Sequence, residues 1–584
     1  MQYSLKQDTA FLKSTFRKSV FPCMLTILSV NVNVFVDGIL VGNRIGADAL
    51  AAINLSLPVY LLLCVAGSLL ASGTAVNAAR AIGSNDGEKS KEYYRTCVVA
   101  TFFTSIFITA AGLAFRDSIV AFLCSDRRIQ PYVMEYTVIT LAGALPKIMI
   151  YVPFWYLRLD GKNIAVTVMM SIMSIGNIVL DIILVYVFNM GVFGAGLASV
   201  IATTLAFMAG CVRLAGKDCF FSFKLFNKPF ISRRFSEWKD ILGTGMPSAL
   251  NNLFSAIRLI ILNDMLLRYG GGDMVAVFTA VNGIAGFGEC ITLGIPQAAS
   301  AILGVYSGEK DNGSCALLVK LEWLSGCACS GIFFVLSIAG AGAIREMYGM
   351  ENSLLVPLFW MALSVFPALL CNILSGYYNM AGKNLWSNGI IFLRVIFMPC
   401  AGLLLAMHFG WSVYSFLFFA EMATILCWFL AAKIRHVFHR NDTVFLLMDT
   451  SLEREGKVLN FSVKSEPADI CNASERITEF CRLNGMDPKK TMRIQLALEE
   501  VMTLISQVNG GDKELNFDLR VYSLEGVTGI RIRYGGREFN PFGEEKEGDE
   551  MYIGIKMIKK LVEKYLYQRT FGVNTFQVFL KEKG

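Results

Sequence analysis

Long apolar runs dominate residues 19–435, and after residue 435 they give way to a mixed pattern of apolar and polar positions. A helix that crosses a membrane needs about 20 mostly apolar residues. Twelve segments reach this length, and we expect each of them to span a membrane. They lie near 19–42, 53–80, 93–115, 132–157, 165–188, 191–213, 240–268, 273–304, 314–342, 354–380, 387–408 and 411–435.

The C-terminal residues follow the pattern of a soluble domain. Short alternating runs predict strands, and longer runs with a helical period predict helices. This order of elements favours an α+β sandwich, in which helices cover one face of a sheet. We expect strands at 457–463, 514–522, 527–533, 566–571 and 574–581, and helices at 467–482, 488–508 and 552–564.

The twelve segments divide into two halves that resemble each other. Pro22 matches Pro247, and Asp48 matches Asp273, both at the same offset along the chain. Gly83 and Gly308 keep this offset, and GKN at 161 recurs at 382 with nearly the same offset. Six segments per half return the chain to its starting side, so we expect two six-helix lobes around an axis along the membrane normal, with a central cavity between them.

The predicted organisation is therefore a polytopic α-helical membrane protein of twelve transmembrane helices in two lobes, followed by a C-terminal α+β sandwich. We expect the following parts: a cytosolic N-terminal arm (1–18), an N-lobe (19–213), a cytosolic connector (214–239), a C-lobe (240–435), a linker (436–455) and the sandwich domain (456–584).

Charge distribution predicts the orientation. Only 17% of the residues are charged, and the net charge is +7. Lysine and arginine gather in the N-terminal arm, after the second segment and in the connector. The positive-inside rule therefore places both termini in the cytosol. We expect the membrane to be the plasma membrane. We expect no signal peptide and no nucleic-acid partner. Fifteen cysteines without a CxxC pair predict neither a disulfide framework nor a structural metal.

Several polar residues fall within the apolar segments, where they are costly and usually face inward. Asn177 and Asp181 lie four residues apart on one helix face. Asp37, Asp181 and Ser199 should lie roughly 8–12 Å below the outer surface, at 1.5 Å rise per residue. Two close carboxylates cannot both ionise easily, so this layer predicts a bound proton, or a cation such as Na⁺ with oxygen ligands. The alternative is that Asn177 and Asp181 only bridge helices by hydrogen bonds.

Four stretches resemble the multidrug and toxic compound extrusion (MATE) family: VFVDGILVGNRIGADALAAINLSLP (34–58), GTAVNAARAIGSNDGEKS (73–90), NIVLDIILVYVFNMGVFGAGLAS (177–199) and GMPSALNNLFS (245–255). The resemblance covers roughly 15–435. It implies alternating access and export coupled to H⁺ or Na⁺. It also implies that the N-lobe cation site is formed by Asp37, Asn177, Asp181 and Ser199.

The C-lobe departs from this pattern. Some members of the family carry a carboxylate in the seventh segment, where this chain has Arg258. Glu289 in the eighth segment is a candidate partner for Arg258, although each could instead bind backbone groups. We expect Arg394 to have a structural role, and Lys147 to snorkel or to line the cavity.

The C-terminal domain resembles the histidine-kinase-like ATPase fold, and most closely the anti-sigma-factor serine kinases. The resemblance covers roughly 457–582 and rests on MRIQLALEEVMTLI, FNPF and YIGIKMIKKLVEKYLYQRTFGVNTFQV. Its nucleotide motifs are degenerate. The Glu of the family motif is kept as Glu500. The family holds Mg²⁺ with an Asn at the position of Leu504, and it binds adenine with an Asp at the position of Tyr534. Gly536 and Gly554 remain, while Tyr552 replaces a second glycine of the lid.

These features favour a cation-coupled antiporter that exports small amphiphilic or cationic compounds, including xenobiotics, and carries a nucleotide-free regulatory domain. We expect no cofactor, no ATPase or kinase activity, and a cytosolic protein partner for the C-terminal domain. Two alternatives remain at this point. One is a membrane sensor whose ATPase-like tail sequesters or phosphorylates a partner, and the other is a flippase for lipids or glycan precursors.

Overall fold

The chain divides into two compact units in a computed structural model. Lys18–Val437 form the first, which we call the membrane domain, and Phe438–Gly584 belong to the second, which we call the tail. Some side chains within helices, that of Asp37 among them, lie outside the described part. The structure describes residues 10–581 except 46, 85, 125–126, 217–218, 222–234, 310, 348–352, 411, 439–442, 449–457, 511–514, 525–526, 544–558, 560–561, 563 and 571–572.

The membrane domain is helical throughout its described ranges. Ten helical segments there are long and apolar enough to cross a membrane, or eleven with one bent pair, while α1 contains the first predicted segment. The N-lobe consists of α1 (Ala10–Ile45), α2 (Ala47–Gly83), α3 (Gly87–Ala114), α4 (Arg116–Leu123), α5 (Gln130–Ala142), α6 (Ala144–Met149), α7 (Tyr151–Leu159), α8 (Asn163–Asp181), the π-helix η1 (Ile182–Val187) and α9 (Gly191–Leu214).

The C-lobe begins with the two predicted segments on either side of residues 269–272. The helix α10 is continuous through the glycines there, but Glu237–Gly270 and Val277–Gly308 are each long and apolar enough to cross a membrane, and the second of them continues into α11. The C-lobe consists of α10 (Phe235–Thr292), α11 (Gly294–Gly308), α12 (Asn312–Ala339), α13 (Ala341–Met347), α14 (Leu355–Met380), α15 (Asn384–Phe392), the π-helix η3 (Leu393–Phe397), α16 (Met398–Phe409), the 3₁₀ turn η4 (Val413–Ser415) and α17 (Phe416–Phe438).

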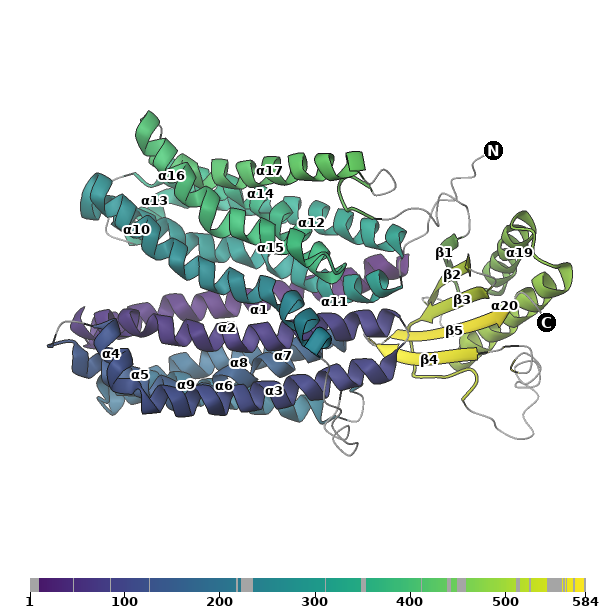
Figure 1. The fold of residues 1–584 in the computed structure, drawn as a ribbon, viewed down its shortest axis with the longest axis horizontal. Coiled ribbons are helices and arrows are strands. Elements are labelled where there is room, and N and C mark those ends of the chain that lie inside the picture. Colours follow the sequence, from purple (N-terminus) through teal and green to yellow (C-terminus); the bar gives the residue numbers. More distant parts are fainter. Residues whose placement is uncertain are drawn as a thin grey trace. The chain divides into compact units, whose positions relative to one another are not determined.

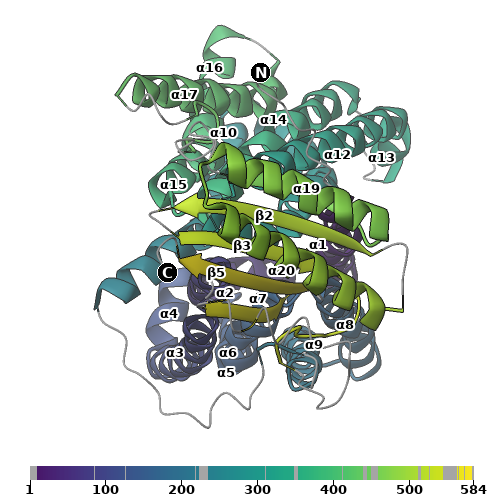
Figure 2. The same cartoon turned by 90° about the vertical axis from the view of Figure 1, so that its right-hand side faces the viewer.

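The two lobes lie side by side and repeat the same local structures (Figures 1 and 2). Asp86 caps α3 by accepting a hydrogen bond from the Lys89 amide, and Asp311 caps α12 in the same way. The repeat offset relates these two caps. The glycine of each GKN turn has a positive φ, +75° at Gly161 and +79° at Gly382, which glycine adopts without steric cost. Equivalent caps and turns support the predicted internal repeat.

A bend in the fourth predicted segment shapes the N-lobe. The axes on either side of Gly143, those of α5 and of α6–α7, differ by 58°. A Cβ atom at Gly143 would lie only 2.3 Å from Cγ2 of Val200, so no larger residue fits there without movement. Pro146, three residues later, lacks an amide donor and further weakens the helix at this point. The bend turns the stretch that starts at Lys147 away from the axis of α5.

The tail holds a five-stranded antiparallel sheet in the order β1-β2-β3-β5-β4. Its helices α19 (Pro467–Leu483) and α20 (Pro488–Val508) cross one face of this sheet (Figure 2). The predicted α+β sandwich is confirmed, although most of the predicted helix at 552–564 lies outside the described residues. The strands are β1 (Val458–Lys464), β2 (Asn516–Leu524), β3 (Val527–Tyr534), β4 (Lys564–Thr570) and β5 (Val573–Lys581).

The tail has its own hydrophobic core, which explains why it forms a separate unit. Phe517 and Phe576 from the sheet and Ile494 and Ile505 from α20 are fully buried in it. Alternate residues of β1, β2, β3 and β5 belong to this core, as the period of two requires.

Candidate functional site

A ladder of polar contacts joins α1 to α8 inside the N-lobe. Both helices run in the same direction, so partners advance together along the two chains. One further helical turn along each helix brings position 37 of α1 level with position 181 of α8. The contacts join the hydroxyl groups of Thr26 and Thr167 (2.9 Å) and of Ser29 and Ser171 (3.4 Å), and the side-chain amides of Asn33 and Asn177 (3.2 Å).

Asp181 lies at the far end of this ladder and is fully buried. Nδ2 of Asn177 donates a hydrogen bond to Oδ2 of Asp181 at 2.8 Å, and Oδ1 of Asn177 accepts one from Asn33. The α-helix gives way to the π-helix η1 directly after Asp181, and such irregular turns are frequent at functional sites. The structure therefore brings together the two residues of the predicted i, i+4 pair.

The other predicted members of this site stand as follows. Position 37 is helical, but the Asp37 side chain lies outside the described part of the chain. Ser199 is half-buried on α9, the helix that packs against α8. Sequence reasoning missed Asn33, although its place one helical turn before Asp37 on α1 was a usable signal.

The C-lobe holds a buried ion pair of its own. Nε of Arg394, in the π-helix η3, donates to both carboxylate oxygens of Glu421 at 3.0 Å. Nη1 of Arg394 donates to Oδ1 of Asn372 at 2.9 Å. The two charged side chains are only 15% and 11% exposed. This pair links the eleventh and twelfth predicted segments and agrees with the structural role expected for Arg394.

Arg258 and Glu289 lie near this ion pair and interact electrostatically with each other and with Arg394. Among the ion pairs of the described residues, however, the close contact joins Arg394 to Glu421, and Arg258 and Glu289 do not form one. The C-lobe therefore holds two positive and two negative side chains in one cluster, in place of the single Arg258–Glu289 pair expected from the sequence.

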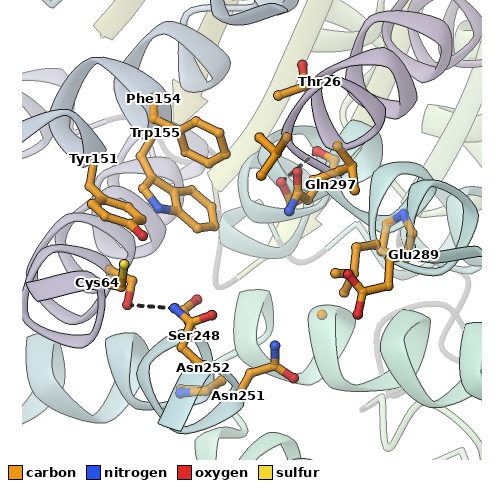
Figure 3. A pocket seen from close by; sticks show the side chains of 18 of the residues that line it. Thr26, Cys64, Tyr151, Phe154, Trp155, Ser248, Asn251, Asn252, Glu289 and Gln297 are labelled. Carbon is orange, nitrogen blue, oxygen red and sulfur yellow. Dashed lines mark hydrogen bonds between the residues drawn. The ribbon is translucent and has the colours of Figure 1, made fainter. Parts of the chain in front are cut away.

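A cavity of about 410 Å³ lies between the two lobes, within the range of small-molecule sites. Figure 3 shows Tyr151, Phe154 and Trp155 together on its N-lobe wall and Ser248, Asn251 and Asn252 on the C-lobe side. Lys147 lines the cavity, which is one of the two roles expected for it from the sequence. Glu289 belongs to the cavity wall on the opposite lobe. Asp181 is not among the described lining residues, so the cavity and the buried carboxylate are distinct places.

The lobes meet closely at one end of the helices, which we call the Gly83 end. A Cβ atom at Gly83 would lie 2.1 Å from the Val305 carbonyl oxygen, and one at Gly308 would lie 2.4 Å from that of Arg80. The repeat offset relates these two contacts. Nε of Arg80 also donates to the carbonyl oxygen of Met380 at 2.9 Å. The contacts lie farther along α2 and α11 than the residues of these helices that line the cavity, and they hold the two lobes together at this end.

Comparison with known proteins identifies this architecture. Residues 22–187, from α1 to η1, match the family described as MatE. A solved structure of MATE in complex with MaL6 superposes with a TM-score of 0.68 and 23% identity, covering 73% of this chain and 96% of the other. Residues of the N-lobe therefore match the MatE family, and the membrane domain shares the fold of solved MATE structures. With ten or eleven candidate spans in its described part, the chain is a multi-pass membrane protein.

Relatives of the chain include a FAD transporter of Shewanella oneidensis, 24% identical over 48% of this chain and 63% of that protein. The multidrug export protein MepA of Staphylococcus haemolyticus is 24% identical over 47% of this chain and 59% of that protein. The chain thus spans less than two thirds of the length of these two relatives. An outward-facing structure of a multidrug resistance MATE transporter matches with a TM-score of 0.67 and 22% identity.

Three residues of the predicted degenerate nucleotide motif, Glu500, Leu504 and Tyr534, lie in the described part of the tail. Leu504 is buried in the core between sheet and helices, and Glu500 is exposed. Tyr534 is fully buried and donates a hydrogen bond to the Phe539 carbonyl. Burial raises the pKa of this phenol well above its usual range, so it stays neutral. Gly536 keeps a φ of +84°, and Gly554 and Tyr552 lie outside the described residues.

We expect the full-length protein to bind neither Mg·ATP nor Mg·ADP. Leu504 supplies no oxygen for the metal, and the Tyr534 hydroxyl is already committed to Phe539. Each missing interaction is worth about 1–3 kcal/mol, so their combined loss should remove measurable affinity. Isothermal titration calorimetry with and without Mg²⁺ checks this. Micromolar binding that depends on Mg²⁺ would show that other residues supply the ligands.

Sequence reasoning also missed Glu322 on α12. This carboxyl is 1% exposed, and within the described ranges neither of its oxygens has a hydrogen-bond partner. A buried polar group without a partner costs stability. The signal in the sequence was the one acidic residue within the long, mostly apolar segment at 314–342.

We expect Glu322→Met to raise the thermal unfolding midpoint of the purified protein. Methionine has a similar volume and needs no partner, so the change should recover about 1–3 kcal/mol. Glu322→Gln is the matched control, since its amide stays unpaired and should leave the midpoint nearly unchanged. A lower midpoint for Glu322→Met, measured in the same detergent, would show that this carboxyl has a stabilising partner.

Proposed function

We propose that this protein is a cation-coupled antiporter that exports amphiphilic small molecules by alternating access. The observation that carries the proposal is the cavity between two equivalent lobes. One of these lobes, the N-lobe, also buries the carboxylate of Asp181. A substrate site between lobes that move against each other is the arrangement alternating access requires. The names of the relatives, a FAD transporter and a multidrug export protein, support export of drug-sized compounds.

The coupling ion is H⁺ or Na⁺, and Asp181 with Asn177 is its site in the N-lobe. A fully buried carboxylate can carry either a proton or a hard cation, and amide and hydroxyl oxygens such as those of Asn177 and Ser199 suit Na⁺. Asp37 completes this site in the proposal, on the basis of its position level with Asp181 and of its match to the family motif.

The Gly83 end is the cytosolic end in this proposal, with both termini in the cytosol and the chain in the plasma membrane. The clustering of lysine and arginine supports this orientation. The conformation is then outward-facing, because the contacts of α2 with α10 and α11 block the cavity from the cytosol. Export requires these contacts to open and close in each cycle.

We expect Gly83→Ala to disfavour this closed cytosolic end and to reduce transport. Its Cβ atom would lie 2.1 Å from a backbone oxygen that cannot move aside by a rotamer change. Overpacking of this kind costs about 1–3 kcal/mol, which shifts the ratio of the two conformations by about tenfold. Distances between spin labels at the ends of α2 and α11 measure the shift.

Gly331→Ala is the matched control, because no described atom lies within 4 Å of the added carbon. Label distances that stay unchanged in Gly83→Ala, together with wild-type flux, would contradict the assignment of these glycines to the cytosolic closure.

Reconstitution tests the function itself. Purified protein in proteoliposomes should move fluorescent amphiphiles only when a pH or Na⁺ gradient is imposed across the membrane. A thermal-shift screen of amphiphilic compounds selects the ones to test, because a ligand that binds the folded state raises its stability. Absence of flux for every compound that stabilises the protein would refute the transporter proposal.

The tail serves in this proposal as a cytosolic module that binds a protein partner and regulates transport. Its support is the separate hydrophobic core of the tail and the filled positions at Leu504 and Tyr534. Deletion of 456–584 should leave gradient-driven flux in proteoliposomes measurable and remove any regulation that the partner exerts in cells.

A further inference from the structure

The central cavity holds two charged side chains, Lys147 from the N-lobe and Glu289 from the C-lobe, among its described lining residues. The other polar groups of the lining are the indole N–H of Trp155 together with amides, hydroxyls and a thiol, as Asn251, Ser248 and Cys64 illustrate in Figure 3. Charge selectivity of the cavity therefore depends on how each of these two charges is compensated by its surroundings.

The negative charge of Glu289 is compensated within the protein. Arg258 and Arg394 both interact electrostatically with Glu289, and Glu421 pairs with Arg394. Two positive and two negative groups therefore sum to zero in this part of the C-lobe. Glu289 has little attraction left for a cationic ligand.

The positive charge of Lys147 has no such balance. Its side chain is 5% exposed, and none of the ion pairs of the described residues includes it. The bend at Gly143 and Pro146 directs this stretch away from the axis of α5. The Lys147 ammonium lies 5.4 Å from the centroid of the Tyr60 ring, a cation–π contact that offsets part of the desolvation cost but not the charge.

A second cation lies farther along the same lobe. Arg158 is 3% exposed, and its guanidinium lies 4.3 Å from the ring centroid of Phe154, which lines the cavity. Its Nη1 donates to Oε1 of Gln297, another lining residue. In the described part of the chain, Nε and Nη2 of Arg158 have no hydrogen-bond partner. Two buried cations therefore make the potential on the N-lobe side of the cavity positive.

The aromatic wall supplies the other half of a ligand site. Tyr60, Tyr151 and Trp155 line the cavity on the lobe that carries Lys147. Flat aromatic bodies pack on such rings by stacking or edge contacts. A ligand that satisfies this wall and the ammonium together has a flat apolar body and an acidic group.

We propose that the cavity binds amphiphilic organic anions, with the carboxylate, sulfonate or phosphate of the ligand at Nζ of Lys147 and its aromatic body against Tyr60, Tyr151 and Trp155. The proposal rests on the proposed transport function and names the substrate class. It differs from the expectation of cationic substrates drawn from the sequence, because Glu289 is neutralised in place and Lys147 is not.

A pair of dyes with the same xanthene ring system tests this proposal. Fluorescein is anionic and rhodamine 6G is cationic, and fluorescence polarisation measures their binding to full-length protein in nanodiscs made of a neutral lipid. We expect fluorescein to bind at least tenfold more tightly than rhodamine 6G. Tighter binding of rhodamine 6G, or no binding of fluorescein, would overturn the proposal without the need for any variant.

Substitutions then locate the charge that matters. We expect Lys147→Met to weaken fluorescein binding at least tenfold and to leave rhodamine 6G unchanged or improved, while Lys147→Arg retains fluorescein. Lys320→Met, at an exposed position of α12, should change neither dye. If Lys147→Met does not fold, the dye comparison in wild-type protein and in the Lys147→Arg variant still decides, because both should bind fluorescein more tightly than rhodamine 6G.

Flux in proteoliposomes separates this proposal from the transport function. Lys147-dependent binding of fluorescein without gradient-driven flux would uphold the anion site and refute transport. Gradient-driven flux of rhodamine 6G without fluorescein binding would uphold transport and refute the anion site.

Discussion

Asp181→Asn should abolish gradient-driven transport while the protein still folds and inserts into the membrane. The substitution keeps the shape of the side chain, and Oδ1 of the new amide can still accept the hydrogen bond that Asn177 donates at 2.8 Å. An amide cannot release a proton at physiological pH, and it cannot balance the charge of Na⁺. We expect flux in proteoliposomes to fall by at least 100-fold, with an unchanged elution volume in size-exclusion chromatography.

Three further variants show whether this loss belongs to the buried site. Asp264→Asn makes the same chemical change at a carboxylate that is 53% exposed on α10, and it should leave flux unchanged. Asp37→Asn should abolish flux as Asp181→Asn does. Ser199→Ala should have a milder effect, about 1 kcal/mol, since it removes one neutral oxygen. Full flux from Asp181→Asn would remove this carboxylate from the coupling mechanism.

Breaking the ion pair between Arg394 and Glu421 should destabilise the C-lobe more than any other single change considered for this lobe. Both charges are largely buried, and Arg394 also holds Asn372. Removal of one partner leaves the other charge buried without its counterion, which costs about 3–5 kcal/mol. Arg394→Met and Glu421→Met should therefore each lower the thermal unfolding midpoint strongly.

The double variant gives the sharper result. Replacement of both partners by methionine leaves no unpaired charge, so it should be less destabilising than either single change. The exposed pair of Asp264 and Arg268 on α10 is the matched control, and its double-mutant cycle should give a coupling energy below about 1 kcal/mol. Strictly additive losses for Arg394 and Glu421 would show that their close contact contributes no coupling.

The membrane fold could be predicted from the sequence because long apolar runs and a constant repeat offset are strong, local signals. The constant offset between the two halves anticipated that Gly83 and Gly308 are equivalent. It could not anticipate that they face each other across the two lobes, because only packing in three dimensions brings α2 against α11.

The candidate site was predicted in part. The i, i+4 spacing of Asn177 and Asp181 correctly places them on one face of α8, since that relation depends only on helix geometry. The partner of Arg394 was not predictable, because Glu421 lies on another helix and several acids were available at similar depth. The same reason led to the expectation that Arg258 pairs with Glu289.

The coupling of ion and substrate movement is the central claim, and substrate-driven ion counterflow tests it most directly. Proteoliposomes would be loaded with a transported dye and a pH-sensitive or Na⁺-sensitive indicator, with no ion gradient at the start. Outward movement of the dye should drive H⁺ or Na⁺ inward through wild-type protein and not through Asp181→Asn. Dye movement at the wild-type rate without any ion signal would contradict the antiporter.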